Sequence, residues 1–179
     1  MRLRDAFVEA RFGVEARQRF RATASPALRE LVTSSDDPKG GWVDFELFVE
    51  ATVLADRLFG KGDLMLAWEI GRFAAGYGAG IWKRLLMRHV SPEAVLGMAA
   101  GLWSHHYDGG KLVSRVFGSS GLCVELVGWP APHRAHCLSI GGWMQGSAEL
   151  GPRRNTAVRE LGCRALGAPT CEFQLTWED

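Results

Sequence analysis

Four residues near the C-terminal end have side chains suited to metal chemistry: Cys137, Glu160, Cys163 and Cys171. Thiolate sulfur and carboxylate oxygen are good zinc ligands, and four protein ligands around one ion form a closed, structural site. The segment between Cys163 and Cys171 contains Gly and Pro, which is typical of a loop between two strands and would bring both thiols together. The residue types therefore suggest a structural zinc site.

The spacing leaves a second interpretation open. Glu160 and Cys163 are an odd number of residues apart, so a regular strand would point them to opposite faces, and one must lie at a bulge or a strand end. Because cysteine is among the most often buried residue types, Cys137 and Cys171 can equally be core residues, with Glu160 exposed to solvent. No role is assigned to the fourth cysteine, Cys123.

Three stretches around these residues resemble the end of a V4R (4-vinyl-reductase-type) domain: 137–146 (CLSIGGWMQG), 159–163 (RELGC) and 168–173 (APTCEF). V4R domains include the sensory domains of aromatic-responsive transcription activators, and the chain is also similar to an uncharacterised myxobacterial family of similar size. In the activators the residues that match Cys137, Glu160, Cys163 and Cys171 bind zinc, so the resemblance implies zinc as a structural cofactor. It also implies a fold shared with haem-based nitric oxide sensors and TRAPP vesicle-tethering subunits.

Such domains hold a small apolar molecule between helices and sheet, and often dimerise. Ligand pockets are mostly apolar with a few polar groups. Together with the resemblance, this predicts a ligand pocket lined by Trp82, Trp103, His106, Tyr107, Phe117 and Trp143. An imidazole at the pocket mouth can hydrogen-bond a ligand or bind a haem iron. The alternative is that these aromatic side chains simply fill the core.

Periodicity predicts an α+β fold with a helical N-terminal half followed by β-β-α-β-β. Helices are expected over 4–20 with an interruption at Gly13, over 26–33, 42–59, 64–75 and 80–88, and from Pro92. Asp63 is a suitable N-cap for the helix over 64–75. Strands are expected over 111–117, 122–127 and 156–162, and a helix over 133–149. Residues 171–177 alternate apolar and polar side chains, which predicts a half-buried strand.

The polar stretch 34–41 (SSDDPKGG) divides the chain into an N-terminal helical extension, 1–41, and a V4R-like domain, 42–179. The formal net charge of +1 provides no field to attract nucleic acid or anionic lipid. The N-terminus lacks the apolar run of a signal peptide, and no stretch is long and apolar enough to span a membrane. A cytoplasmic location is therefore expected.

Together with the resemblance, which implies a sensory role and a homodimer, the sequence favours a non-enzymatic domain that binds a small hydrophobic ligand and acts through a protein partner. One alternative is a protein-interaction module of TRAPP-like fold without a ligand. Another is a reductase-associated enzyme, which only the family name suggests, since no acid–base pair or nucleophile can be recognised from spacing.

Overall fold

The computed structural model describes residues 2–34, 42–77, 89–91, 94, 101 and 103–178. Three short helices begin the chain, and two longer ones follow: α1 (Arg2–Phe12), α2 (Val14–Thr23), α3 (Pro26–Thr33), α4 (Phe45–Phe59) and α5 (Met65–Gly76). Gly13 separates α1 from α2 with φ 93°, a left-handed conformation that favours glycine. This confirms the predicted interruption.

The C-terminal half forms one four-stranded sheet in the order β1-β2-β4-β3, with every pair antiparallel. Its elements are a 3-10 helix η1 (Trp103–His105), β1 (Lys111–Val116), β2 (Gly121–Val127), α8 (Arg134–Glu149), β3 (Arg154–Gly162), a 3-10 helix η2 (Arg164–Leu166) and β4 (Cys171–Glu178). The α+β class is therefore confirmed. The predicted helix over 80–88 lies outside the described residues.

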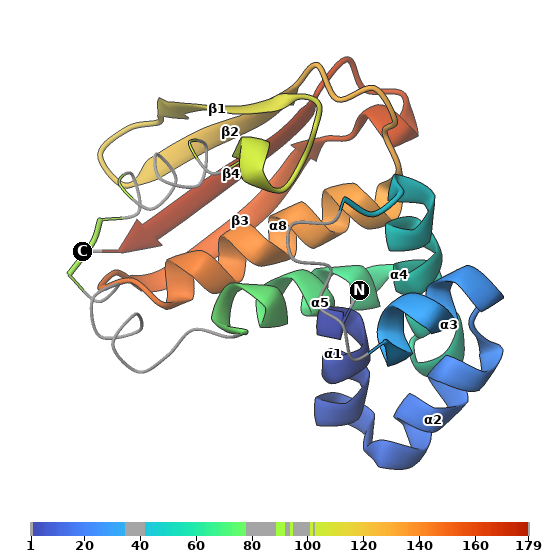
Figure 1. The fold of residues 1–179 in the computed structure, drawn as a ribbon. Helices are drawn as coiled ribbons and strands as arrows, with labels where there is room; N and C mark the ends of the chain where they lie inside the picture. The colour runs from blue at the N-terminus through green and yellow to red at the C-terminus, as the bar shows by residue number, and fades with distance from the viewer. Residues whose placement is uncertain are drawn as a thin grey trace.

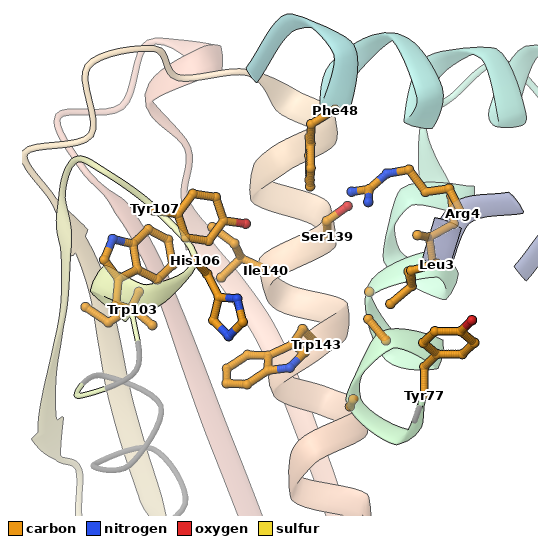
Figure 2. Close-up of a pocket in the computed structure, with 15 residues that line it drawn as sticks. Leu3, Arg4, Phe48, Tyr77, Trp103, His106, Tyr107, Ser139, Ile140 and Trp143 are labelled. Carbon is orange, nitrogen blue, oxygen red and sulfur yellow. The ribbon is translucent and has the colours of Figure 1, made fainter. Parts of the chain in front are cut away.

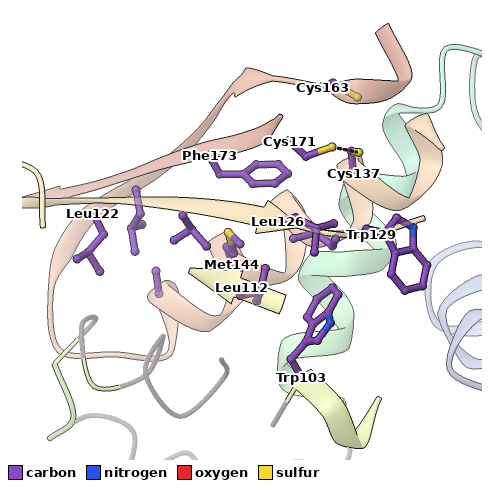
Figure 3. Packing of buried hydrophobic residues seen from close by; sticks show 14 of the residues in the cluster. Trp103, Leu112, Leu122, Leu126, Trp129, Cys137, Met144, Cys163, Cys171 and Phe173 are labelled. Carbon is purple, nitrogen blue, oxygen red and sulfur yellow. Dashed lines mark hydrogen bonds between the residues drawn. The ribbon is translucent and has the colours of Figure 1, made fainter. Parts of the chain in front are cut away.

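The sheet and helices form layers (Figure 1). Helix α8 lies along one face of the sheet, α5 runs beside α8, and α1–α4 gather near one end of this pair. A core between the sheet and α8 contains Val124, Leu126, Phe173, Ile140 and Met144 (Figure 3). In β4 the alternate residues Cys171, Phe173, Leu175 and Trp177 are buried, which confirms the predicted half-buried strand.

A second core joins the N-terminal helices to α4 and α5. Phe7 and Val8 of α1 belong to the same buried cluster as Leu54 of α4 and Ile70 of α5. The N-terminal segment therefore contributes directly to the packing of the helical layer. Among the described residues, no helix has both the length and the apolar character required to cross a bilayer.

Glycines allow α5 and α8 to approach closely. A Cβ atom built at Gly71 would lie 2.0 Å from the carbonyl oxygen of Ser139, and one at Gly142 would lie 2.0 Å from that of Trp68. At Gly146 the corresponding distance to the carbonyl oxygen of Arg72 is 2.5 Å. Real side chains do not fit at these distances, so the two backbones meet only where the Cβ is missing.

The start of α5 is held by Asp56 of α4. This buried carboxylate accepts hydrogen bonds from the backbone N–H of Leu64 (3.0 Å) and Leu66 (3.2 Å). Asp63, the predicted N-cap, accepts only the exposed N–H of Met65 at 3.0 Å. The prediction located the helix start to within one residue, but Leu64 occupies the N-cap position and a residue from the preceding helix supplies the main capping contacts.

Replacing Asp56 by alanine is therefore expected to lower the free energy of unfolding by about 2–3 kcal/mol, because one buried and one partly buried N–H group lose their carboxylate acceptor. Asp63→Ala, the matched control, should lower it by about 0.5–1 kcal/mol. Urea unfolding of the three proteins measures both effects. Equal losses for the two variants would contradict the assignment of Asp56 as the principal cap.

Candidate ligand cavity

A cavity of ≈ 500 Å³ opens between the helical layer and the sheet (Figure 2). This volume is within the usual range for a small-molecule or cofactor site. Its walls come from α1, α4, α5, η1, β1 and α8, and the lining includes Leu3, Ile70, Leu112, Ile140 and Trp143. The described lining residues include no aspartate or glutamate, so the cavity combines an apolar wall with a small number of polar groups.

Arg4 is the one arginine or lysine among the described lining residues. It projects from α1 into the cavity near Phe48 and Ser139 (Figure 2), and only 7% of the residue is exposed. Its Nε donates to Oγ1 of Thr52 at 2.8 Å, and its guanidinium carbon lies 3.7 Å from the centre of the Phe48 ring. Burial lowers the pKa of Arg4 to about 10, so it still carries a charge at neutral pH.

Two side chains after η1 face the same space. The backbone N–H groups of His106 and Tyr107 both donate to the carbonyl oxygen of Trp103 at 2.9 Å, which makes a tight turn. The Tyr107 ring stacks on Trp103 with centroids 4.1 Å apart, and Trp103 Nε1 donates to the carbonyl of Gly109 at 2.8 Å. Figure 2 shows the His106 imidazole and the Tyr107 hydroxyl directed into the cavity.

Neither polar group is engaged by the described part of the protein. The His106 imidazole, on an exposed residue, forms no hydrogen bond with a described residue, and neither does the Tyr107 hydroxyl. Burial raises the pKa of Tyr107, so its hydroxyl remains a neutral donor at physiological pH. A neutral imidazole nitrogen can bind a metal ion, and a phenol can donate a hydrogen bond to an anion.

The structure places four of the predicted pocket residues around this one cavity: Trp103, His106, Tyr107 and Trp143. Phe117 is not among them, because it follows the far end of β1 and is 50% exposed. Trp82 lies outside the described residues. That the four residues bind a ligand remains a prediction.

Arg4 and Ser139 line the cavity although sequence reasoning did not select them. Arg4 had a detectable signal: it lies three and four residues before Phe7 and Val8, on the buried side of α1. A charged residue on an apolar helix face indicates either an ion pair or a ligand contact. The hydroxyl of Ser139 donates to the carbonyl oxygen of Ala67 at 3.2 Å, which gave no signal in the sequence.

His136 lies beside the cavity and is fully buried among aromatic rings. Its ring centroid is 5.0 Å from Trp129, 5.1 Å from Phe45 and 5.4 Å from Phe48. Neither ring nitrogen has a hydrogen-bond partner among the described residues. Burial, with the positive charge of Arg4 nearby, lowers the pKa of His136 to about 3, so this ring is neutral at physiological pH.

The three cysteines predicted as metal ligands come together near the N-terminal end of α8. The sulfur atoms of Cys137, Cys163 and Cys171 lie within 4.8 Å of one another, and Cys137 and Cys171 are 3.3 Å apart. All three are buried in the core between α8 and the sheet (Figure 3). Burial, with the neighbouring Cys171, raises the pKa of the Cys137 thiol, so that group stays protonated.

Glu160 does not complete this cluster. The register of β3 with β4 shifts between Glu160 and Gly162, which is the irregularity that the odd spacing required. The Glu160 carboxylate accepts a hydrogen bond from Arg134, with which it forms an ion pair. The carboxylate is therefore balanced by an arginine within the protein.

The fold matches solved structures of H-NOX proteins. One from Shewanella oneidensis in the Fe(II)NO state superposes with a TM-score of 0.69 at 13% identity, covering 99% of this chain and 96% of that chain. A structure concerned with haem redox potential and porphyrin distortion gives a TM-score of 0.67 at 12% identity, covering 97% and 96%. An oxygen-binding H-NOX domain related to soluble guanylate cyclases gives 0.64 at 11%, covering 99% and 92%.

At these identities the likeness establishes the fold. No protein-family model matches the chain, and no curated protein sequence matches it.

Two expectations are corrected by these matches. The V4R assignment is wrong, because the structures that match almost the whole chain are H-NOX proteins. Zinc as the cofactor is wrong for the same reason, since the matched proteins are haem proteins. The physical reason lies in the residues that carried the resemblance: three buried cysteines belong to the hydrophobic core, and Glu160 is paired with Arg134.

Proposed function

We propose that this chain is a haem-binding sensory domain, with His106 as the ligand of the haem iron. The observation that carries the proposal is the position of the His106 imidazole, which lines an apolar cavity of ≈ 500 Å³ in an H-NOX-like fold. Neutral imidazole is the ligand of haem iron in many haem proteins.

The residues present fit this group. A flat apolar macrocycle needs a wall of aromatic and aliphatic side chains, which Trp103, Trp143 and Ile140 provide. His106 has no competing hydrogen bond with a described residue, so its ring nitrogens are available. Haem would supply an iron centre able to bind a small gas.

The remaining residues position the ligand and limit the access of water. The hydrogen bonds to the Trp103 carbonyl hold His106 in a tight turn, and the Trp103 indole is fixed by its contact with Gly109. On the opposite wall, the close contact of α5 with α8 places Gly71 and Ile70 at the cavity surface. A change at the cavity can therefore reach the α5–α8 pair directly. A homodimer and a protein partner remain predictions of the sequence.

Adding haem to the purified chain is expected to give the sharp Soret band of a bound, ligated haem. His106→Ala should weaken haem binding by about tenfold or more, because the iron loses its protein ligand, and added imidazole should restore the band. The matched control is His89→Ala, an exposed histidine that does not line the cavity, and it should bind as the wild type does.

Absorption titration distinguishes the outcomes. A wild-type chain that leaves only the spectrum of free haem would overturn the proposal. Unchanged binding by His106→Ala would show that a different residue holds the iron.

A further inference from the structure

Arg4 is a buried cation for which the described part of the chain supplies no counterion. It is more than nine-tenths buried, yet none of the ion pairs between described residues includes it. Other arginines of the N-terminal helices do have acidic partners: Arg17 pairs with Glu9, and Arg21 pairs with Asp5. Burying an unpaired charge is costly, so a balancing anion is expected where such a charge persists.

The contacts of Arg4 leave most of its donors unused. A guanidinium has five N–H donors, and Nε uses one of them on Thr52. The two terminal nitrogens form no hydrogen bond with a described residue. The Phe48 ring, 3.7 Å away, attracts the cation but accepts no conventional hydrogen bond. Those four N–H groups are therefore available to a ligand in the cavity.

Tyr107 adds a second donor on the wall of the same cavity. The two side chains are near enough for the charge of Arg4 to act on the pKa of Tyr107, and Figure 2 shows both polar ends directed into the cavity. The described lining residues include no carboxylate that would repel an anion or occupy Arg4. A planar guanidinium matches the two oxygens of a carboxylate and binds them side by side.

We infer that the ligand of this cavity carries a carboxylate, which binds Arg4 and the Tyr107 hydroxyl while its apolar body lies against the aromatic wall. The inference deepens the proposed function and rests on it for the ligand's general position. The ligand class is a flat, apolar carboxylic acid: haem is one member, through its propionates, and free aromatic acids are others.

The test compares each acid with its methyl ester, which keeps the shape and removes the charge. The probes are haem and haem dimethyl ester, and the fluorescent acid anthracene-9-carboxylate with its methyl ester. The wild-type chain should bind each acid about tenfold to a hundredfold more tightly than its ester, as a charged hydrogen bond in a buried site predicts. Arg4→Met should abolish that preference by weakening only the acids.

Three variants make the result specific. Arg11→Met removes an exposed arginine of the same helix, whose partner Glu69 is 3.6 Å away, and should keep the preference for acids. Tyr107→Phe should reduce the preference in part. Arg4→Lys keeps the charge and serves if Arg4→Met does not fold, and it should retain a smaller preference because its single ammonium cannot bind two oxygens side by side.

The possible failures are separate. If haem and its ester bind equally to the wild-type chain, the inference about Arg4 is overturned while the haem proposal stands. If neither haem species binds but anthracene-9-carboxylate binds more tightly than its ester, the carboxylate inference stands and the haem proposal fails. If none of the four probes binds, both are overturned.

Discussion

Replacing Gly142 by alanine is expected to lower the free energy of unfolding by about 3 kcal/mol or more, the upper end for overpacked sites. The added methyl group would lie 2.0 Å from the backbone oxygen of Trp68 and 2.7 Å from its carbonyl carbon. Backbone atoms inside a packed helix cannot turn away as a flexible side chain can. The gain in helix propensity from glycine to alanine, about 1 kcal/mol, is too small to compensate.

Gly101→Ala is the matched control, because it changes another helical glycine whose added Cβ would have no described atom within 4 Å. That variant should be as stable as the wild type or slightly more stable. Thermal and urea unfolding of the two variants measure the difference. A Gly142→Ala protein with wild-type stability would show that α5 and α8 do not approach as closely as described.

Gly142→Ala also tests whether the packing of α5 against α8 affects ligand binding. Gly71 of α5 and Ser139 of α8 line the cavity and lie at the same close crossing. If the helices separate by even a fraction of an ångström, the wall of the cavity must move. Ligand affinity in Gly142→Ala is therefore expected to fall together with stability.

The sequence predicted correctly those elements whose signal lies within one short stretch of the chain. The alternation of Cys171, Phe173, Leu175 and Trp177 identified β4 because one face of that strand is buried and the other is not. Gly13 marked the break between the first two helices, since its φ of 93° is unfavourable for other residues.

Residues whose role depends on a distant partner were harder to predict. Arg4 was one of many arginines in a basic segment, and only the packing of α1 against α4 shows that it enters a cavity. Phe117 was placed in the pocket, but Leu112 is the β1 residue that lines it. Leu112 and Phe117 are five positions apart, which in extended chain is about 16 Å. Because five is an odd number, their side chains also point to opposite faces.

For the cysteines, the sequence predicted their positions better than their chemical role. The loop after β3 brings Cys163 and Cys171 together near Cys137, as the sequence suggested. Zinc was chosen from the residue types together with a family resemblance, whereas the matched folds belong to haem proteins. A cluster of thiols is equally compatible with a core, because cysteine is frequently buried.

The unfolding free energy is expected to fall by about 3 kcal/mol between pH 7 and pH 4 through His136 alone. Its pKa is about 3 in the folded protein, against 6.5 for an ordinary histidine, chiefly because the ring is buried among Phe45, Phe48 and Trp129. Between these two pKa values the unfolded chain binds a proton that the folded protein does not. The contribution of neutral His136 to the free energy of unfolding is therefore fully present above pH 6.5 and decreases as the pH falls toward 3.

The groups around His136 reinforce this direction. Arg4 and His133 both oppose a positive charge on the ring, and Tyr107, whose ring centroid is 5.2 Å away, stays neutral. Neither ring nitrogen has a described partner that would stabilise the protonated form. In acid, the unfolded chain is therefore favoured because its His136 binds a proton that the folded protein does not accept.

His136→Leu, similar in volume, should remove this contribution, and the difference between its stability and that of the wild type should grow from pH 7 to pH 4. His89→Gln, at an exposed position, should follow the wild-type curve throughout. Urea unfolding at a series of pH values gives both curves, with the carboxylates contributing equally to each. If the difference between wild type and His136→Leu is constant with pH, then His136 is accessible to protons in the folded state, and the aromatic cluster is more open than its packing indicates.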